Sequence, residues 1–192
     1  LEKNHIRNAV ICSKEMCFAL MGISINDTLL DTIVNDMIQK TVEINNCACS
    51  AIISNPLSDY LKLADTYQKL KEGFHIRMIR KQQWQCIFLD ELQYDRIMLH
   101  ISEDTEVHQF IRCKLGPLVE YDRAHDTQLL ETLEALIQNH NSRKLAAESL
   151  FLHRNTMVHR INKIEEVLHC SLDDTEIMEQ LEFAIKMKMY AH

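Results

Sequence analysis

The stretch from Asn141 to Leu168 constrains the fold of this chain most, because it predicts two helices joined by a tight turn. In its second half, apolar residues recur every three or four positions, which places them in one narrow stripe of a helix. The stripe consists of Met157, Ile161, Ile164 and Leu168. A shorter helix is predicted over Arg143 to Leu150, with Asn141 or Ser142 as its N-cap. Its apolar side would comprise Leu145, Ala146, Ala147 and Leu150.

The opposite arc of the second helix is polar and basic. Its amide, hydroxyl, imidazole, guanidinium and ammonium groups suit the base edges and phosphates of DNA. The candidate DNA-binding residues on this arc are Asn155, Thr156, His159, Arg160 and Lys163, preceded by His153 and Arg154. His153 could either cap the second helix or contact phosphate. On periodicity alone, a helical hairpin with a solvated polar face remains the alternative.

The same stretch resembles a known DNA-binding domain. The segment FLHRNTMVHRINKIEEVLHCSLDD is similar to the C-terminal helix-turn-helix of the PucR/CdaR family of bacterial transcription regulators. The resemblance extends from Leu115 to about Ala184 and rests on several spaced features. These are Leu115-Gly116-Pro117-Leu118, Tyr121-Asp122, Ala146-Ala147, His153-Arg154-Asn155-Thr156 and Leu172-Asp173.

The resemblance implies how such a domain would bind double-stranded DNA. The helix from Arg154 would enter the major groove, and Arg143 and Lys144 would approach the backbone from the preceding helix. The core is also similar to the Fis-type helix-turn-helix, which has a basic residue where this chain has Arg160. The family usually has another large or basic residue in place of Val158-His159, so a base preference is not carried over.

The charge distribution fits a modular regulator better than a protein that binds nucleic acid over its whole surface. The net charge of the 192-residue chain is −7, yet residues 139–170 have five basic and three acidic side chains, a local balance of +2. The chain has no signal or transit peptide and no apolar run of membrane-spanning length. We therefore expect a cytoplasmic protein with no membrane partner.

The cysteines and histidines do not indicate a metal site or a cofactor. Seven cysteines occur without a CxxC motif, and ten histidines occur without an HxxxH motif on a predicted helix. Free thiols and solvated or capping histidines are the better interpretation. Motifs for a Ser or Cys nucleophile are also absent, so no catalytic residue is predicted.

The first hundred residues predict an alternation of strands and helices. The predicted strands are Asn8–Cys12, Met16–Ile23, Cys49–Ser54 and Trp84–Leu89. Two helices would follow the caps Asn26 or Asp27 and Ser58, and a third would extend from Asp90 to Leu99. This order predicts an α+β domain with a mixed or antiparallel sheet. With the segment SNPLSDYLKLADTYQKL, it resembles the degenerate GGDEF-like domain of CdaR-type regulators.

An active cyclase of that fold would have a Gly-rich motif with paired acids in the hairpin turn. The turn here is Ser13-Lys14-Glu15, so we predict that this domain is not catalytic. A nucleotide-binding or cyclase-like enzyme built on residues 1–100 remains the alternative function, as does a protein-interaction module. Turnover of GTP with magnesium would favour the first of these, and DNA affinity that does not depend on salt would favour the second.

The sequence places a domain boundary after residue 102. Residues 1–102 would form the GGDEF-like domain, and residues 103–192 the helix-turn-helix domain, with its core at 127–170. A short helix over Thr105–Lys114 would end at a hinge, where Pro117 would open the next helix. A strong amphipathic helix follows over Thr127–Gln138, and a closing helix over Thr175–Tyr190.

The closing helix also motivates a prediction about assembly. Phe183, Met187 and Tyr190 lie off its main apolar stripe, which suggests a homodimer or a contact with a missing domain. The chain begins with Leu1 and opens in the middle of a pattern, so we expect a fragment. A small-molecule effector would then bind a region outside this chain. The sequence thus predicts a metabolite-responsive, DNA-binding transcription regulator.

Overall fold

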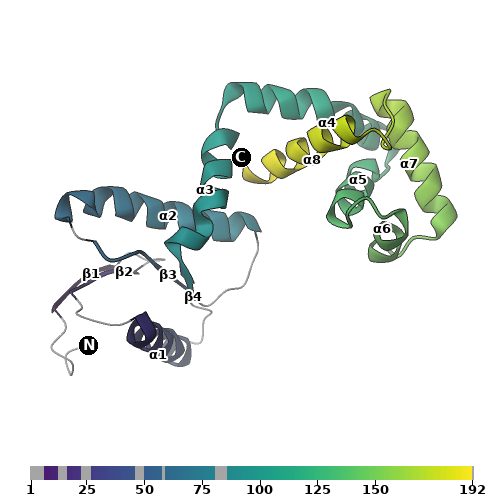
Figure 1. Cartoon of the computed structure of the whole chain (residues 1–192). Helices are drawn as coiled ribbons and strands as arrows, with labels where there is room; N and C mark the ends of the chain where they lie inside the picture. Colours follow the sequence, from purple (N-terminus) through teal and green to yellow (C-terminus); the bar gives the residue numbers. More distant parts are fainter. Residues whose placement is uncertain are drawn as a thin grey trace. The chain divides into compact units, whose positions relative to one another are not determined.

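The computed structural model describes residues 7–12, 17–22, 27–45, 50–57, 59–80 and 86–191. The chain divides into two compact units (Figure 1). Unit 1 comprises Leu1–Ile53 and Trp84–Ile87, and unit 2 comprises Ser54–Gln83 and Phe88–His192. Each unit is described by itself below.

Unit 1 contains the β-hairpin that the sequence predicted. Strands β1 (Arg7–Cys12) and β2 (Cys17–Gly22) pair in antiparallel register, with Cys12 opposite Cys17. Helix α1 (Asp27–Asn45) follows, and β3 (Ala51–Ile53) pairs with β4 (Cys86–Phe88). The predicted Ser13-Lys14-Glu15 turn, and with it the missing cyclase motif, lies outside the described residues.

The predicted single sheet is not confirmed. In the described ranges the strands form two separate pairs, β1-β2 and β3-β4, and most of the chain is helical. The strands of the second pair are three residues long, whereas a strand usually has about five or six residues. Such short strands have few backbone groups with which a further strand could pair. The strands and helices therefore follow the predicted order, and the sheet that would join them is not confirmed.

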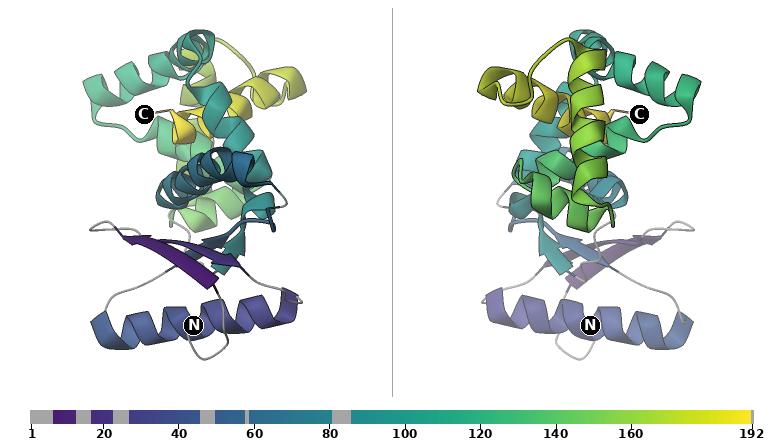
Figure 2. Two further views of the ribbon diagram at one scale, coloured as in Figure 1. Left: turned by 90° about the vertical axis from the view of Figure 1, so that its left-hand side faces the viewer. Right: turned by 90° about the vertical axis from the view of Figure 1, so that its right-hand side faces the viewer.

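Unit 2 is helical. Its elements are η2 (Tyr60–Lys62), α2 (Leu63–Arg80), η3 (Leu89–Leu92), α3 (Gln93–Ser102), α4 (Thr105–His125), α5 (Leu129–Gln138), α6 (Arg143–Ser149), α7 (Arg154–Leu168) and α8 (Thr175–Tyr190). One buried cluster is formed by residues of α4, α5, α6, α7 and α8. Helices α4 and α8 lie side by side (Figure 1). Its fully buried members include Leu115, Leu118, Leu133, Met157, Ile161, Ile164 and Leu181. Seen from the side, α7 lies on the outside of the unit (Figure 2).

The predicted hinge at Leu115–Leu118 is wrong, because α4 is one continuous helix with Pro117 inside it. Proline in a helix interior costs about 3 kcal/mol, since it removes a hydrogen bond and crowds the preceding turn. Leu115 and Leu118 flank it and are 1% and 0% exposed. Burying two leucines contributes roughly 1.5–3 kcal/mol each, enough to offset the cost of the proline.

Replacing this proline should therefore stabilise the protein. We expect Pro117→Ala to raise the free energy of unfolding by up to about 3 kcal/mol, because the new N–H can bond the Cys113 carbonyl. Urea denaturation measures the change. Gly116→Ala is the matched control, since an added Cβ at Gly116 meets nothing within 4 Å and should contribute about 1 kcal/mol. A loss of stability in Pro117→Ala would show that the helix depends on the proline.

The face of α8 that suggested a dimer is largely covered by the chain itself. Met187 and Tyr190 are 0% and 3% exposed, whereas Phe183 remains 39% exposed. The Tyr190 hydroxyl donates to buried Asp95 of α3, which also accepts from Nε of Arg80 at 2.7 Å. Burial, followed by the hydrogen bond to Asp95, raises the pKa of Tyr190 to about 12. These contacts join α2, α3 and α8 across the predicted boundary at 102/103, which stays a prediction.

Candidate nucleic-acid interface

Helix α6 begins and packs as the sequence predicted, with one exception. The Ser142 hydroxyl accepts from the Leu145 N–H at 3.4 Å, and Ala146 and Ala147 are buried. The Leu145 side chain is 48% exposed, so its predicted place in the core is wrong. At about 100° per residue, Leu145 lies roughly 200° from Ala147, and the short helix turns only one side inward.

The turn between α6 and α7 is closed by backbone hydrogen bonds. The Leu152 N–H donates to the Ala147 carbonyl at 2.8 Å, and the Phe151 N–H donates to the Glu148 carbonyl at 3.1 Å. Phe151 has a left-handed backbone, with φ at 55°. This bond pattern ends a helix and redirects the chain sharply. It sets the angle at which α7 leaves α6.

Helix α7 buries the predicted stripe. Met157, Ile161 and Ile164 are at most 1% exposed, and Leu168 is half-buried. His153 caps the helix, because its Nδ1 accepts from the Asn155 N–H at 3.3 Å. The core therefore fixes which side of α7 faces outward.

Four of the predicted site residues lie together on the outward side of α7. Arg154, Asn155, Thr156 and His159 are exposed. Within the described part of the chain, the side chains of these residues have no hydrogen-bond or ion-pair partner. Their polar groups are thus available to a ligand, and we call these four residues the outer arc.

Arg160 does not join the outer arc, because its guanidinium turns towards α5. Nη1 donates to Thr132 Oγ1 at 3.1 Å, and Nη2 donates to Gln128 Oε1 at 3.2 Å. Thr132 is fully buried. Arg160 thus ties α7 to the first turn of α5, a contact that periodicity alone did not reveal.

The remaining basic site residues are all paired with acids. Lys163 donates to Glu166 at 2.5 Å, and this hydrogen bond raises the pKa of Lys163. Arg143 donates to Asp173 at 2.8 Å, and Lys144 lies 4.0 Å from Glu148. Lys144 is 85% exposed, and an exposed pair of this kind contributes little to stability, so it can exchange partners.

Asp122, in the last turn of α4, has a structural role that the sequence did not reveal, although Tyr121-Asp122 is part of the family resemblance. Its carboxylate accepts from the N–H groups of Leu129 and Leu130 at 2.8 and 2.9 Å and from the Thr127 hydroxyl. Partial burial opposes the charge, but these hydrogen bonds and the Arg160 charge outweigh it and lower the pKa of Asp122. Asp122 therefore caps α5 from seven residues upstream, beyond the range of a local capping pattern.

The lowered pKa predicts a pH-dependent contribution to stability. The folded protein holds Asp122 ionised below its ordinary pKa of 3.8, so the contribution is present above about pH 4 and is lost as the pH falls through the folded pKa. We expect Asp122→Asn to lower the free energy of unfolding by about 1–2 kcal/mol at pH 7 and by less at pH 3. Urea denaturation at both pH values is the measurement. Asp126→Asn, at a nearby exposed position, is the control, and an equal deficit at both pH values would contradict the capping role.

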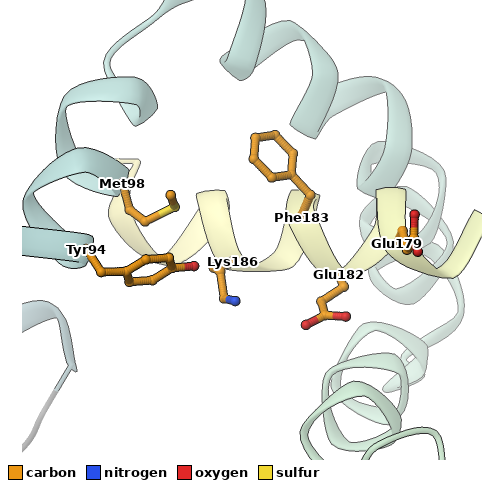
Figure 3. A pocket seen from close by; sticks show the side chains of 6 residues that line it. All are labelled: Tyr94, Met98, Glu179, Glu182, Phe183 and Lys186. Carbon is orange, nitrogen blue, oxygen red and sulfur yellow. The ribbon is translucent and has the colours of Figure 1, made fainter. Parts of the chain in front are cut away.

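Three further observations on the described residues bear on other kinds of site. Among these residues, no cluster of three His, Cys, Asp or Glu side chains could hold a metal ion. None of the helices in the described ranges is both long and apolar enough to span a bilayer. An open pocket of about 180 Å³ lies between α3 and α8, lined by Tyr94, Met98, Glu179, Glu182, Phe183 and Lys186 (Figure 3). It is smaller than the roughly 300–1,000 Å³ of small-molecule sites.

Unit 2 contains a helix-turn-helix domain. Helices α6 and α7 pack together and are joined by a sharp turn, α7 faces outward, and α5 packs against both. Residues 129–187 match the PucR C-terminal helix-turn-helix domain. The helix-turn-helix domain of this chain is thus of the PucR type, and the chain is similar to transcription regulators of the PucR/CdaR type.

Three relatives illustrate this similarity. The chain is 31% identical to the proline-responsive transcriptional activator PutR of Bacillus subtilis (strain 168), over 67% of this chain and 32% of that protein. It is 32% identical to the purine catabolism regulatory protein of the same strain, over 47% of this chain and 17% of that protein. It is 24% identical to the carbohydrate diacid regulator of Escherichia coli (strain K12), over 70% and 34% respectively. The matches thus span about a third or less of each relative's length.

Proposed function

We propose that this chain binds double-stranded DNA through the outer arc of α7 and so acts in a transcription regulator. The observation that supports this most is the division of α7 into a buried stripe and an exposed arc of unpaired polar side chains. Amide, hydroxyl, imidazole and guanidinium groups recognise base edges and phosphates. The names of the relatives, among them a purine catabolism regulatory protein and a carbohydrate diacid regulator, support the same role.

The proposed docking follows from the positions of these groups. The first turn of α7, with Arg154 and Asn155, enters the major groove, as recognition helices do in this class. Lys144 and Arg143 approach the phosphates from α6, which requires their exposed pairs with Glu148 and Asp173 to open. Arg160 keeps α7 in position rather than contacting DNA. Lys163 lies on the last turns of α7 and serves as a phosphate contact.

The rest of the regulator is proposed from the family. Residues 1–102 would form a non-catalytic GGDEF-like domain, supported by the observed order of strands and helices. Residues 103–192 would form the DNA-binding domain. A small-molecule effector would act through a region outside this chain. The name of one relative, the proline-responsive activator, supports an effector of this kind.

A homodimer is also part of this proposal. One helix-turn-helix makes few phosphate contacts, and a pair reads two half-sites roughly 34–36 Å apart. Phe183 is the residue of the suggested face that remains partly exposed. Sedimentation equilibrium of the full-length protein tests the dimer. A species that stays monomeric at micromolar concentration with operator DNA present would rule it out.

The outer arc can be tested by a single substitution with a matched control. We expect Arg154→Ala to weaken binding to a duplex selected from a random pool by roughly 1–3 kcal/mol, at an unchanged melting temperature, because its side chain has no partner in the described structure. Lys69→Ala also removes one positive charge, from a half-exposed lysine of α2 that is paired with Asp65, and should have little effect. Fluorescence anisotropy measures both. Equal binding by Arg154→Ala and the wild type would refute the assignment.

A further inference from the structure

Phe151 is placed where a folded protein gains nothing from a phenylalanine. Its side chain is 97% exposed, so it buries almost no apolar surface. Its φ of 55° lies in the left-handed region, where a side chain is strained and glycine is favoured. Glycine is also the usual residue where a helix ends with the bond pattern seen between Leu152 and Ala147. Packing and backbone geometry therefore both disfavour the residue that is present.

The position of Phe151 points to the ligand it serves. It lies in the turn between α6 and α7, two residues before the cap His153 and three before the exposed Arg154. In helix-turn-helix proteins the start of the second helix is the part closest to base edges. Arg154, whose side chain is exposed, lies in the first turn of α7 directly after this turn. A partner that suits both residues has negative charges for Arg154 and apolar atoms for Phe151.

We propose that Phe151 contacts duplex DNA through its apolar atoms, against a deoxyribose or the methyl group of a thymine. This inference rests on the proposed function and extends the interface beyond polar residues. Phenylalanine is suited to both contacts, since the thymine methyl and the sugar edge are the apolar surfaces that a groove presents. The strain at Phe151 is then retained because it projects the ring towards the DNA.

The structure predicts opposite effects of one substitution on stability and on binding. Phe151→Gly removes the left-handed strain, so the melting temperature of the 192-residue chain should rise. The same change removes the ring, so affinity for a duplex selected by the wild type should fall at least about fivefold. Phe151→Ala should lose affinity without the gain in melting temperature, and Phe151→Trp should bind within about twofold of the wild type.

His169→Gly is the matched control. His169 is also exposed and has a left-handed backbone, with φ at 51°, but it lies at the C-terminal end of α7. It should gain stability and keep its affinity. Replacing thymine by deoxyuridine in the duplex distinguishes the two contacts, since only a thymine contact is lost with the methyl group. If the wild type binds and Phe151→Gly binds within twofold of it, or if Phe151→Gly melts lower, the inference is overturned. If the wild type selects no duplex, the proposed function itself fails.

Discussion

Met157→Ala is expected to lower the free energy of unfolding of unit 2 by about 2–5 kcal/mol. Met157 is 1% exposed and lies in the cluster that α7 shares with α4, α5 and α8. Truncation would remove buried apolar surface and leave a cavity that close-packed neighbours fill only in part. Because this core fixes which side of α7 faces outward, DNA binding should fail together with folding.

Two other methionine substitutions control for this effect. Met157→Leu keeps the side-chain volume and should cost less than about 1.5 kcal/mol. Met189→Ala on α8 removes a side chain that is 49% exposed and should change stability by at most about 0.5 kcal/mol. Urea denaturation followed by circular dichroism measures all three. A Met157→Ala protein as stable as Met189→Ala would show that the stripe does not form the core.

Arg160→Ala is expected to lower the free energy of unfolding by about 1–3 kcal/mol. The change removes two charge-assisted hydrogen bonds, to Thr132 of α5 and to its N-cap residue Gln128, and the buried Thr132 hydroxyl oxygen loses its bond from the guanidinium. DNA binding should weaken as a consequence, because α7 would no longer be held at its angle to α5. The sequence predicted that Arg160 contacts DNA. The structure suggests a different role, in which Arg160 holds α7 against α5.

Arg160→Lys and Lys163→Ala separate the two roles of Arg160. Lysine keeps the positive charge but not the fork that reaches two acceptors, so Arg160→Lys should be destabilised nearly as much as Arg160→Ala. Lys163→Ala should remain stable, since its pair with Glu166 is on the surface. Thermal melting and DNA affinity are measured in parallel. An Arg160→Ala protein of wild-type stability with reduced DNA affinity would instead show a direct contact with DNA.

The helix-turn-helix could be predicted from the sequence because local signals agree there. The caps Ser142 and His153, the small residues of α6 and the stripe of α7 all indicate the same two helices. Helix α8 was predicted with the bounds Thr175–Tyr190 that it has in the structure. Periodicity is a strong signal wherever one side of a helix is buried.

The features that the sequence did not reveal depend on tertiary contacts. Pro117 by itself predicts a helix break, but burial of Leu115 and Leu118 stabilises α4 as one continuous helix. Asp122 caps a helix that starts seven residues later, and Arg160 bonds across to α5. Each of these contacts depends on how two helices pack, and the periodicity of a single helix gives no information about that packing. The same limit applies to the sheet predicted for the first hundred residues.

The most direct test of the account is the salt dependence of DNA binding by the 192-residue chain. A duplex is first selected from a random pool, and its affinity is then measured by fluorescence anisotropy between 50 and 200 mM salt or so. If α7 and its basic neighbours bind DNA, the logarithm of the affinity should fall linearly with the logarithm of salt concentration, by roughly 0.9 per phosphate contacted. Failure to select any duplex, or an affinity that does not change with salt, would contradict the account.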